Sequence, residues 1–280
     1  MDDNQGDPER IDPDEEYYIA AERAERMASV LCWMAAVSFS VYVAFHNSDH
    51  TTGTIAKIFF VVFTTTALVL GYCQKFVLLP YCDRRRRLLL ISDSLGIKLS
   101  EKPQTGYYTN LLPTSMRRFV LSLAENTFFY PRLLAHEMPG LIALASILVF
   151  ALAASIRFGT AELIELFAVV LLFSEVAMGR LIRLLWAKQQ FNILYDDCCT
   201  ILRCWPSTQK RQYVELLRLF SEYESIKARS SIRASTRTFR ELNPKLTAQW
   251  KVIRERIESD IEHEAGEEES RKAEELARRS

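Results

Sequence analysis

The sequence predicts an all-α protein with four transmembrane helices, arranged as two hairpins, together with a cytosolic helical domain. Apolar residues gather in four runs, and nearly all the charged residues, 25% of the 280 positions, lie outside them. Each run holds about 20 residues, enough for a helix to cross a hydrocarbon core of roughly 30 Å. Short turns separate the first run from the second and the third from the fourth, whereas a long segment with a basic run lies between the second and third, so the runs group into two pairs.

The N-terminal part reads as an acidic arm followed by a helix that leads into the first membrane span. We expect this part to cover residues 1–26, and its acidic start is unlike the basic start of a signal peptide. Residues 27–79 form the predicted first transmembrane hairpin. Its two spans are Met27–Phe45 and Ile55–Leu79, and Pro80 is expected to end the second.

The middle segment, residues 80–138, is predicted to be a cytosolic helical insert. The second span is expected to continue as a helix over Leu88–Gly96, with Gly96 as its cap. Thr114–Phe129 has the spacing of an amphipathic helix. A short helix framed by Pro131 and Pro139 then returns the chain to the membrane.

The second transmembrane hairpin covers residues 139–187, and a second cytosolic helical segment covers residues 188–264. Within that segment we predict a helix over Lys210–Arg229 and a last helix opened by Pro244, because apolar residues recur there at helical spacing. Residues 265–280 are rich in Glu and Arg and are predicted to be a charged, solvated tail.

The distribution of Lys and Arg also predicts the orientation. Basic residues stay on the cytoplasmic side, so both termini and the middle segment should lie in the cytoplasm of a multi-pass protein of the cell inner membrane. The run Arg84, Arg85, Arg86 and Arg87 is part of this signal. It is predicted to contact the membrane or another anion, either lipid headgroups as part of the topology signal or a bound nucleotide or anionic lipid.

One acid interrupts the fourth apolar run. Glu175 lies on one helical stripe with small residues, and intramembrane acids usually face other helices or a wet cavity. The second span carries Gln74 and Lys75 on a similar stripe of small and polar residues. We therefore expect Glu175 to contact Lys75 or Gln74 as a structural partner, and the alternative is an acid that lines or gates a pore.

No motif in the sequence predicts a reaction. It contains no Gly-rich phosphate loop, no HExxH, no GxSxG and no zinc-binding spacing of Cys and His, so we expect no catalytic residue, cofactor or metal. The six cysteines form no CxxC pair and are expected to be reduced. The formal net charge of +0 hides an uneven distribution and gives no reason to expect direct binding of nucleic acid.

Several short motifs resemble those of a family of uncharacterised bacterial four-span proteins. They are Gly106-Tyr-Tyr-Thr-Asn110, Glu125-Asn-Thr-Phe-Phe129, Tyr223-Glu224, Leu242-Asn243-Pro244 and Trp250. The arrangement of two hairpins with cytosolic helices is also similar to the four-transmembrane effectors of cyclic-oligonucleotide antiphage systems. This second resemblance is one of architecture, and it implies a membrane-perturbing effector whose cytosolic part senses a nucleotide or a partner protein.

Two classes of function follow. The first is a pore-forming effector of a bacterial defence system, gated through its cytosolic helices and working as a homo-oligomer in the lipid bilayer. The second is a membrane scaffold or regulatory protein that conducts nothing and holds a cytosolic partner. Both classes are non-enzymatic. They differ in whether the stripe around Glu175 faces a wet cavity in an oligomer or is sealed within one protomer.

Overall fold

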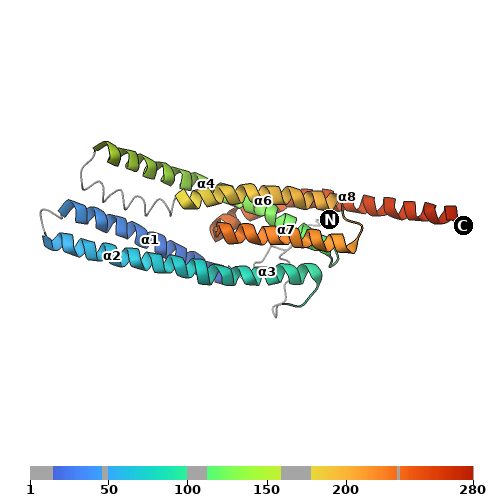
Figure 1. Cartoon of the computed structure of the whole chain (residues 1–280), viewed down its shortest axis with the longest axis horizontal. Helices are drawn as coiled ribbons and strands as arrows, with labels where there is room; N and C mark the ends of the chain where they lie inside the picture. Colours follow the sequence, from blue (N-terminus) through green and yellow to red (C-terminus); the bar gives the residue numbers. More distant parts are fainter. Residues whose placement is uncertain (1–14, 46–49, 100–111, 159–177, 232–233, 280) are drawn as a thin grey trace, which may run out of the picture.

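The structure is a computed structural model that describes residues 15–45, 50–99, 112–158, 178–231 and 234–279. All the regular secondary structure in these ranges is helical, with no strand, so the predicted all-α class is confirmed for them. The helices lie along one long axis, and the C-terminal end of the last helix projects at one end (Figure 1).

The first two helices form a hairpin whose outer faces are apolar. Helix α1 (Glu15–Phe45) and helix α2 (His50–Cys73) pack side by side (Figure 1), and the rings of Phe39 and Phe60 lie 5.3 Å apart between them. Large apolar side chains on the other faces are exposed, including Val37 and Ile58. A continuous α1 also confirms the predicted lead-in helix.

Within the described residues, two helical stretches are long and apolar enough to cross a membrane, Tyr18–Val43 and His50–Leu95. They match the predicted first hairpin. The predicted fourth span falls largely in residues 159–177, which lie outside the described residues. The predicted third span forms the C-terminal part of a longer helix, described below.

The prediction that Pro80 ends the second span was wrong, because the helix continues. A π-helical turn η1 (Gln74–Leu78) joins α2 to α3 (Leu79–Leu95), and the backbone N–H of Leu79 donates to the carbonyl of Gln74, five residues back. A proline ring normally clashes with the carbonyl four residues back, and the wider turn relieves this conflict. The predicted cap is confirmed, since α3 ends at Leu95 and Gly96 caps it with a left-handed φ of 69°.

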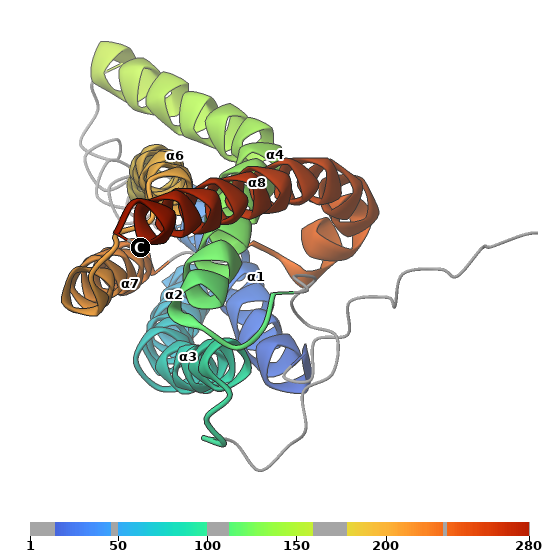
Figure 2. The same cartoon turned by 90° about the vertical axis from the view of Figure 1, so that its right-hand side faces the viewer.

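Helix α4 (Met116–Phe158) is the centre of the helical core. It runs without a break through Pro131 and Pro139, so the prediction of a short helix framed by these prolines was wrong. All its residues from Phe119 to Phe129 are buried, and α3, α6, α7 and α8 surround it (Figure 2). The sequence predicted one apolar side for this helix, as in an amphipathic helix. The prediction missed that neighbouring helices also bury its other side.

The last three helices complete this core. They are α6 (Arg180–Arg203), α7 (Gln209–Ser230) and α8 (Thr236–Arg279). Helix α7 matches its predicted range within one residue at each end, whereas α8 begins before Pro244 and includes it. One buried cluster draws on α3, α4, α6, α7 and α8, with Trp250 of α8 fully buried against the ring of Phe128, 5.5 Å away.

Candidate functional site

A cluster of polar side chains lies where the apolar hairpin meets the helical core. Its members come from five different parts of the chain, and we call them the junction cluster: Glu25 of α1, Gln74 of η1, Glu137 of α4, Arg180 of α6, and Ser235, which directly precedes α8. These parts are up to 210 residues apart in the sequence, from Glu25 to Ser235. A change at any member can therefore act on several helices.

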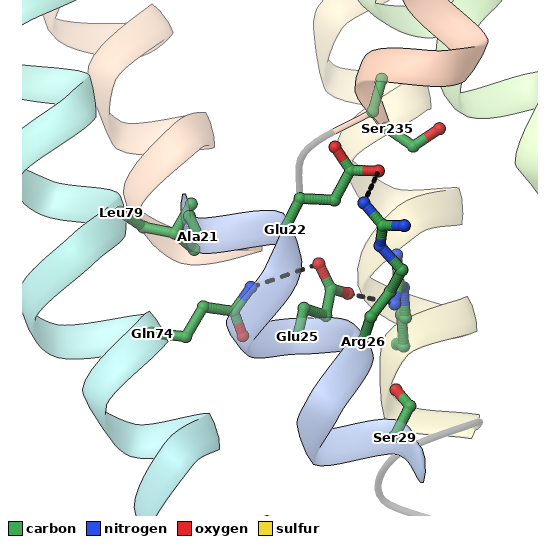
Figure 3. A pocket seen from close by; sticks show the side chains of 10 residues that line it. Ala21, Glu22, Glu25, Arg26, Ser29, Gln74, Leu79 and Ser235 are labelled. Carbon is green, nitrogen blue, oxygen red and sulfur yellow. Dashed lines mark hydrogen bonds and ion pairs between the residues drawn. The ribbon is translucent and has the colours of Figure 1, made fainter. Parts of the chain in front are cut away.

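Arg180 occupies the middle of the junction cluster. Its guanidinium pairs closely with the Glu25 carboxylate through one nitrogen, and its other terminal nitrogen lies 3.7 Å from the Glu137 carboxylate. The second oxygen of Glu25 accepts a 3.2 Å hydrogen bond from the Gln74 amide (Figure 3). The second oxygen of Glu137 accepts a 2.6 Å hydrogen bond from the backbone N–H of Ser235. One cation thus holds two carboxylates that would otherwise repel each other.

A cavity of about 280 Å³ opens beside these residues. Figure 3 shows Glu22, Arg26 and Ser29 of α1 on one side of it and Gln74 and Leu79 on the other. The Arg26 guanidinium lies 3.7 Å from the Glu22 carboxylate on the rim. The lining combines both signs of charge with hydroxyl and amide groups and with the apolar side chains of Ala21, Leu79 and Ala234.

The local sequence explains how the junction cluster is placed. Glu25 lies two residues before Met27, an exposed apolar residue of α1, and Arg180 is the first residue of α6. The π-helical turn lies next to Pro80 and starts at Gln74, whose amide reaches Glu25. Single π-helical turns are often found at functional sites because they redirect the side chains around them.

A second set of contacts joins α3 to α7, and we call it the α3–α7 latch. The Lys227 ammonium lies 2.6 Å from the Asp83 carboxylate, and Arg87 lies 2.7 Å from Glu224. The side chain of Lys227 is only 6% exposed, so its charge depends on Asp83. Because α3 continues the second apolar helix, the latch links that helix directly to α7.

Burial and neighbouring charges shift the pKa values of Lys227 and Glu224 in the α3–α7 latch. Burial opposes the charge of Lys227, but the Asp83 carboxylate and the surrounding tyrosine hydroxyls outweigh it and raise the pKa of the ammonium well above its usual range. Burial raises the pKa of Glu224, and the nearby Lys227 and Arg87 partly oppose that rise. Lys227 therefore stays charged at neutral pH.

The structure divides the predicted anion-binding arginines into two groups. Arg87 pairs with Glu224, and Arg86 lies over the ring of Tyr18, 4.8 Å from its centroid, so both face the protein. Arg84 is exposed, whereas Arg85 is half-buried and its guanidinium donates to the Tyr81 hydroxyl over 3.4 Å. The contact of this run with lipid or another anion stays a prediction.

The predicted intramembrane residues have different outcomes. Glu175 lies outside the described residues, so its contact with Lys75 or Gln74 stays a prediction. The structure places Gln74 against Glu25 and leaves Lys75 exposed. The acid that the sequence interpretation overlooked is Glu25, although a carboxylate two residues before the apolar run that begins at Met27 was a signal that could have found it.

Metal-ligating side chains do not gather in the part of the chain that the structure describes: no group of three or more His, Cys, Asp or Glu residues there could hold a metal ion. Burial raises the pKa of the Cys198 thiol well above its usual value, and it also raises that of Cys199. Thiols of this kind react slowly because the thiolate is the nucleophile.

Comparison of the chain with models of protein families, with curated protein sequences and with solved structures gives no match.

Proposed function

We propose that the chain is an integral protein of a bacterial inner membrane that works as a pore-forming or membrane-perturbing effector, gated through its cytosolic helices. The helical core is the cytosolic part, and the apolar helices form four spans in two hairpins. The resemblances described above imply the effector role and a nucleotide or partner protein as the activating signal. Lipid and further copies of the chain are the remaining partners.

One observation supports this proposal most strongly, namely that Arg180 joins the apolar hairpin to the helical core. Glu25 belongs to an apolar helix, whereas Glu137 and Arg180 adjoin the buried cluster. A signal that moves α6 or α8 changes the distances between the charges of the junction cluster. Because Glu25 of α1 is one of these charges, α1 then shifts as well. Transitions of this kind let small shifts at a sensing domain become movements of membrane helices.

The exposed apolar faces of α1 and α2 support the membrane placement. Trp33 is 59% exposed and Phe59 is 50% exposed, as are many neighbours of similar size. Contiguous apolar surface of this extent is unfavourable in water and suits lipid. A water-soluble core helix with the same composition would instead be covered by other helices.

Reporter fusions test the membrane placement and orientation. Reporters inserted after Gly53 and after Gly159 should lie outside the cytoplasm, and one after Gly106 should lie inside. An external signal from the Gly106 fusion would overturn the orientation, and recovery of the whole chain in the soluble fraction would overturn the membrane placement.

Membrane potential in growing cells tests the gating. We expect induced expression of Arg180→Gln to depolarise a bacterial host more than the wild-type chain at equal membrane abundance, because Glu25 and Glu137 then repel each other without a cation between them. Arg180→Lys keeps the charge and should behave like the wild type. Arg211→Gln, which removes an exposed charge from α7, is the matched control.

The alternative function is a scaffold or regulatory membrane protein without conduction. It predicts that neither the wild-type chain nor Arg180→Gln depolarises the host, and that the helical core still captures a cytosolic partner. Full membrane abundance of all variants without any depolarisation would favour this alternative and contradict the effector.

A further inference from the structure

One stripe of α1 changes from charged to apolar beside the cavity at the junction cluster. Glu22, Arg26 and Ser29 lie on this stripe and line the cavity. Trp33 and Val37 follow at steps of four residues, so they continue the same stripe along the helix. Trp33 is 59% exposed and Val37 is 63% exposed. The cavity therefore borders the apolar surface of the first hairpin.

The charges that line the cavity are balanced. They belong to two acids and two arginines, namely Glu22, Glu25, Arg26 and Arg180. Glu25 and Arg180 pair closely with each other, and Glu25 also accepts a hydrogen bond from Gln74. Glu22 and Arg26 are held less closely, since the guanidinium nitrogen and the carboxylate oxygen are 3.7 Å apart, beyond hydrogen-bond distance. A ligand that carries both signs of charge can contact this looser pair, whereas the carboxylates would repel a simple anion.

The two members of the looser pair differ in their exposure. The side chain of Arg26 is 70% exposed, whereas that of Glu22 is 18% exposed. Figure 3 shows both on the α1 side of the cavity, with Ser29 about one turn further along the helix. A guanidinium can donate two parallel hydrogen bonds to a phosphate, and a serine hydroxyl can donate one more. The open end of the pair thus suits a phosphate, and the more enclosed carboxylate suits an ammonium.

We propose that this part of the cavity binds the headgroup of an aminophospholipid such as phosphatidylethanolamine. Arg26 and Ser29 donate hydrogen bonds to its phosphate, and the Glu22 carboxylate accepts hydrogen bonds from its primary ammonium. The cavity of about 280 Å³ is close to the lower end of the roughly 300–1,000 Å³ range of ligand sites, so it has room for a headgroup without the acyl chains. This inference rests on the membrane placement under the proposed function.

The apolar part of the stripe favours a lipid over a soluble amino phosphate. Acyl chains that leave the cavity can pack along Trp33 and Val37, and each methylene group that they bury there adds to the affinity. A soluble compound with the same headgroup has only the polar contacts, which contribute little where water reaches them. Tryptophan is also enriched at the depth where headgroups meet acyl chains.

Lipid binding to the purified full chain tests the inference. Native mass spectrometry in a mild detergent would compare titrations of phosphatidylethanolamine, of phosphatidylglycerol, which has no ammonium, and of phosphatidylcholine, whose ammonium has no N–H group. The proteins are the wild type, Arg26→Gln, Glu22→Gln and Arg23→Gln. Arg23 is an exposed residue of α1 outside the cavity lining, so its variant is the matched control. O-phosphoethanolamine, the headgroup without acyl chains, would be added as a competitor at the concentration of the lipid.

The wild type should bind phosphatidylethanolamine about tenfold more tightly than the other two lipids, because only a primary ammonium donates hydrogen bonds to Glu22. Arg26→Gln should weaken this binding by about tenfold, because the charge-assisted contacts to the phosphate are lost. Glu22→Gln should abolish the preference over phosphatidylglycerol without weakening the binding of phosphatidylglycerol. The control Arg23→Gln should change each affinity by less than about threefold.

Several results would overturn the site. Equal binding of the three lipids by the wild type would do so without any variant. A preference for phosphatidylethanolamine that survives Glu22→Gln would exclude the ammonium contact. Equal effects of Arg26→Gln and Arg23→Gln would exclude the phosphate contact. Displacement of the lipid by O-phosphoethanolamine would identify a soluble ligand in place of a lipid.

Extraction of cell membranes with alkaline carbonate separates a failure of the site from a failure of the proposed function. If carbonate releases the wild-type chain, the membrane placement itself is wrong. If the chain stays in the membranes but does not prefer phosphatidylethanolamine, only the lipid site is wrong.

Discussion

Replacing Asp83 by asparagine removes the charge that faces the buried ammonium of Lys227. Breaking a fully buried ion pair from one side costs about 3–5 kcal/mol, because the remaining charge stays in a poor solvent. The side chain of Lys227 is 6% exposed but that of Asp83 is 30% exposed, so water screens part of the pair. We therefore expect Asp83→Asn to destabilise the chain by about 2–3 kcal/mol.

This loss is large enough to measure by heating. For a chain of this size a change of 1 kcal/mol moves the unfolding temperature by about 2–4 °C, so Asp83→Asn should lower it by about 4–12 °C. The assay is the fraction of purified protein that remains monodisperse in detergent after heating. Arg87→Gln breaks the more exposed pair with Glu224 and should cost at most about 1 kcal/mol.

The double variant Asp83→Asn/Lys227→Met isolates the cause. Methionine fills much of the space of the lysine stem without a charge, so most of the lost stability should return. If the double variant is as unstable as Asp83→Asn alone, or if Asp83→Asn costs no more than Arg87→Gln, the account of the latch is refuted.

Three further predictions concern the stability of the helical core. Folding raises the pKa of Lys227, so the Lys227–Asp83 pair stabilises the fold fully below the unfolded-state pKa of about 10.4. This stabilisation is lost only as the pH rises through the higher folded-state pKa. Titration of Lys227 should therefore not lower the unfolding temperature between pH 7 and pH 9. A pH series on the wild type and Lys227→Met checks this, and a fall within that range that the variant lacks would contradict it. Gly96→Ala should cost about 1–2 kcal/mol in the same heating assay, because φ is 69° and a Cβ atom would lie 3.2 Å from the Thr114 side chain. An unchanged unfolding temperature in Gly96→Ala would refute that strain. Removing residues 265–280 should shift the unfolding temperature by less than about 2 °C, since Ile257 is the last of the described side chains of α8 in the buried cluster. A larger shift would show that the tail packs on the protein.

Local patterns predicted much of the helical structure. The spacing of apolar residues correctly placed the lead-in helix of α1 and the helix α7, and Gly96 was correctly read as a cap. These features depend on neighbours within a few residues, which a sequence displays directly. The prolines were misread, because α4 runs on through both Pro131, which is buried, and Pro139, which is exposed.

The candidate site was much harder to predict. Arg180 meets Glu25 across 155 residues, and Lys227 meets Asp83 across 144. Each of these residues alone resembles an ordinary charge at the end of an apolar stretch or on a helix surface. Only the packing of the helices brings them together, so periodicity cannot reveal the pairs.

Ion flux through a defined membrane tests the central claim most directly. The full chain would be reconstituted into vesicles with a potassium gradient, as the wild type, as Arg180→Gln and as Arg180→Lys, at equal amounts of inserted protein. We expect Arg180→Gln to dissipate the gradient well before the other two. Vesicles with Arg180→Gln that hold the gradient as long as protein-free vesicles would contradict a gated membrane effector.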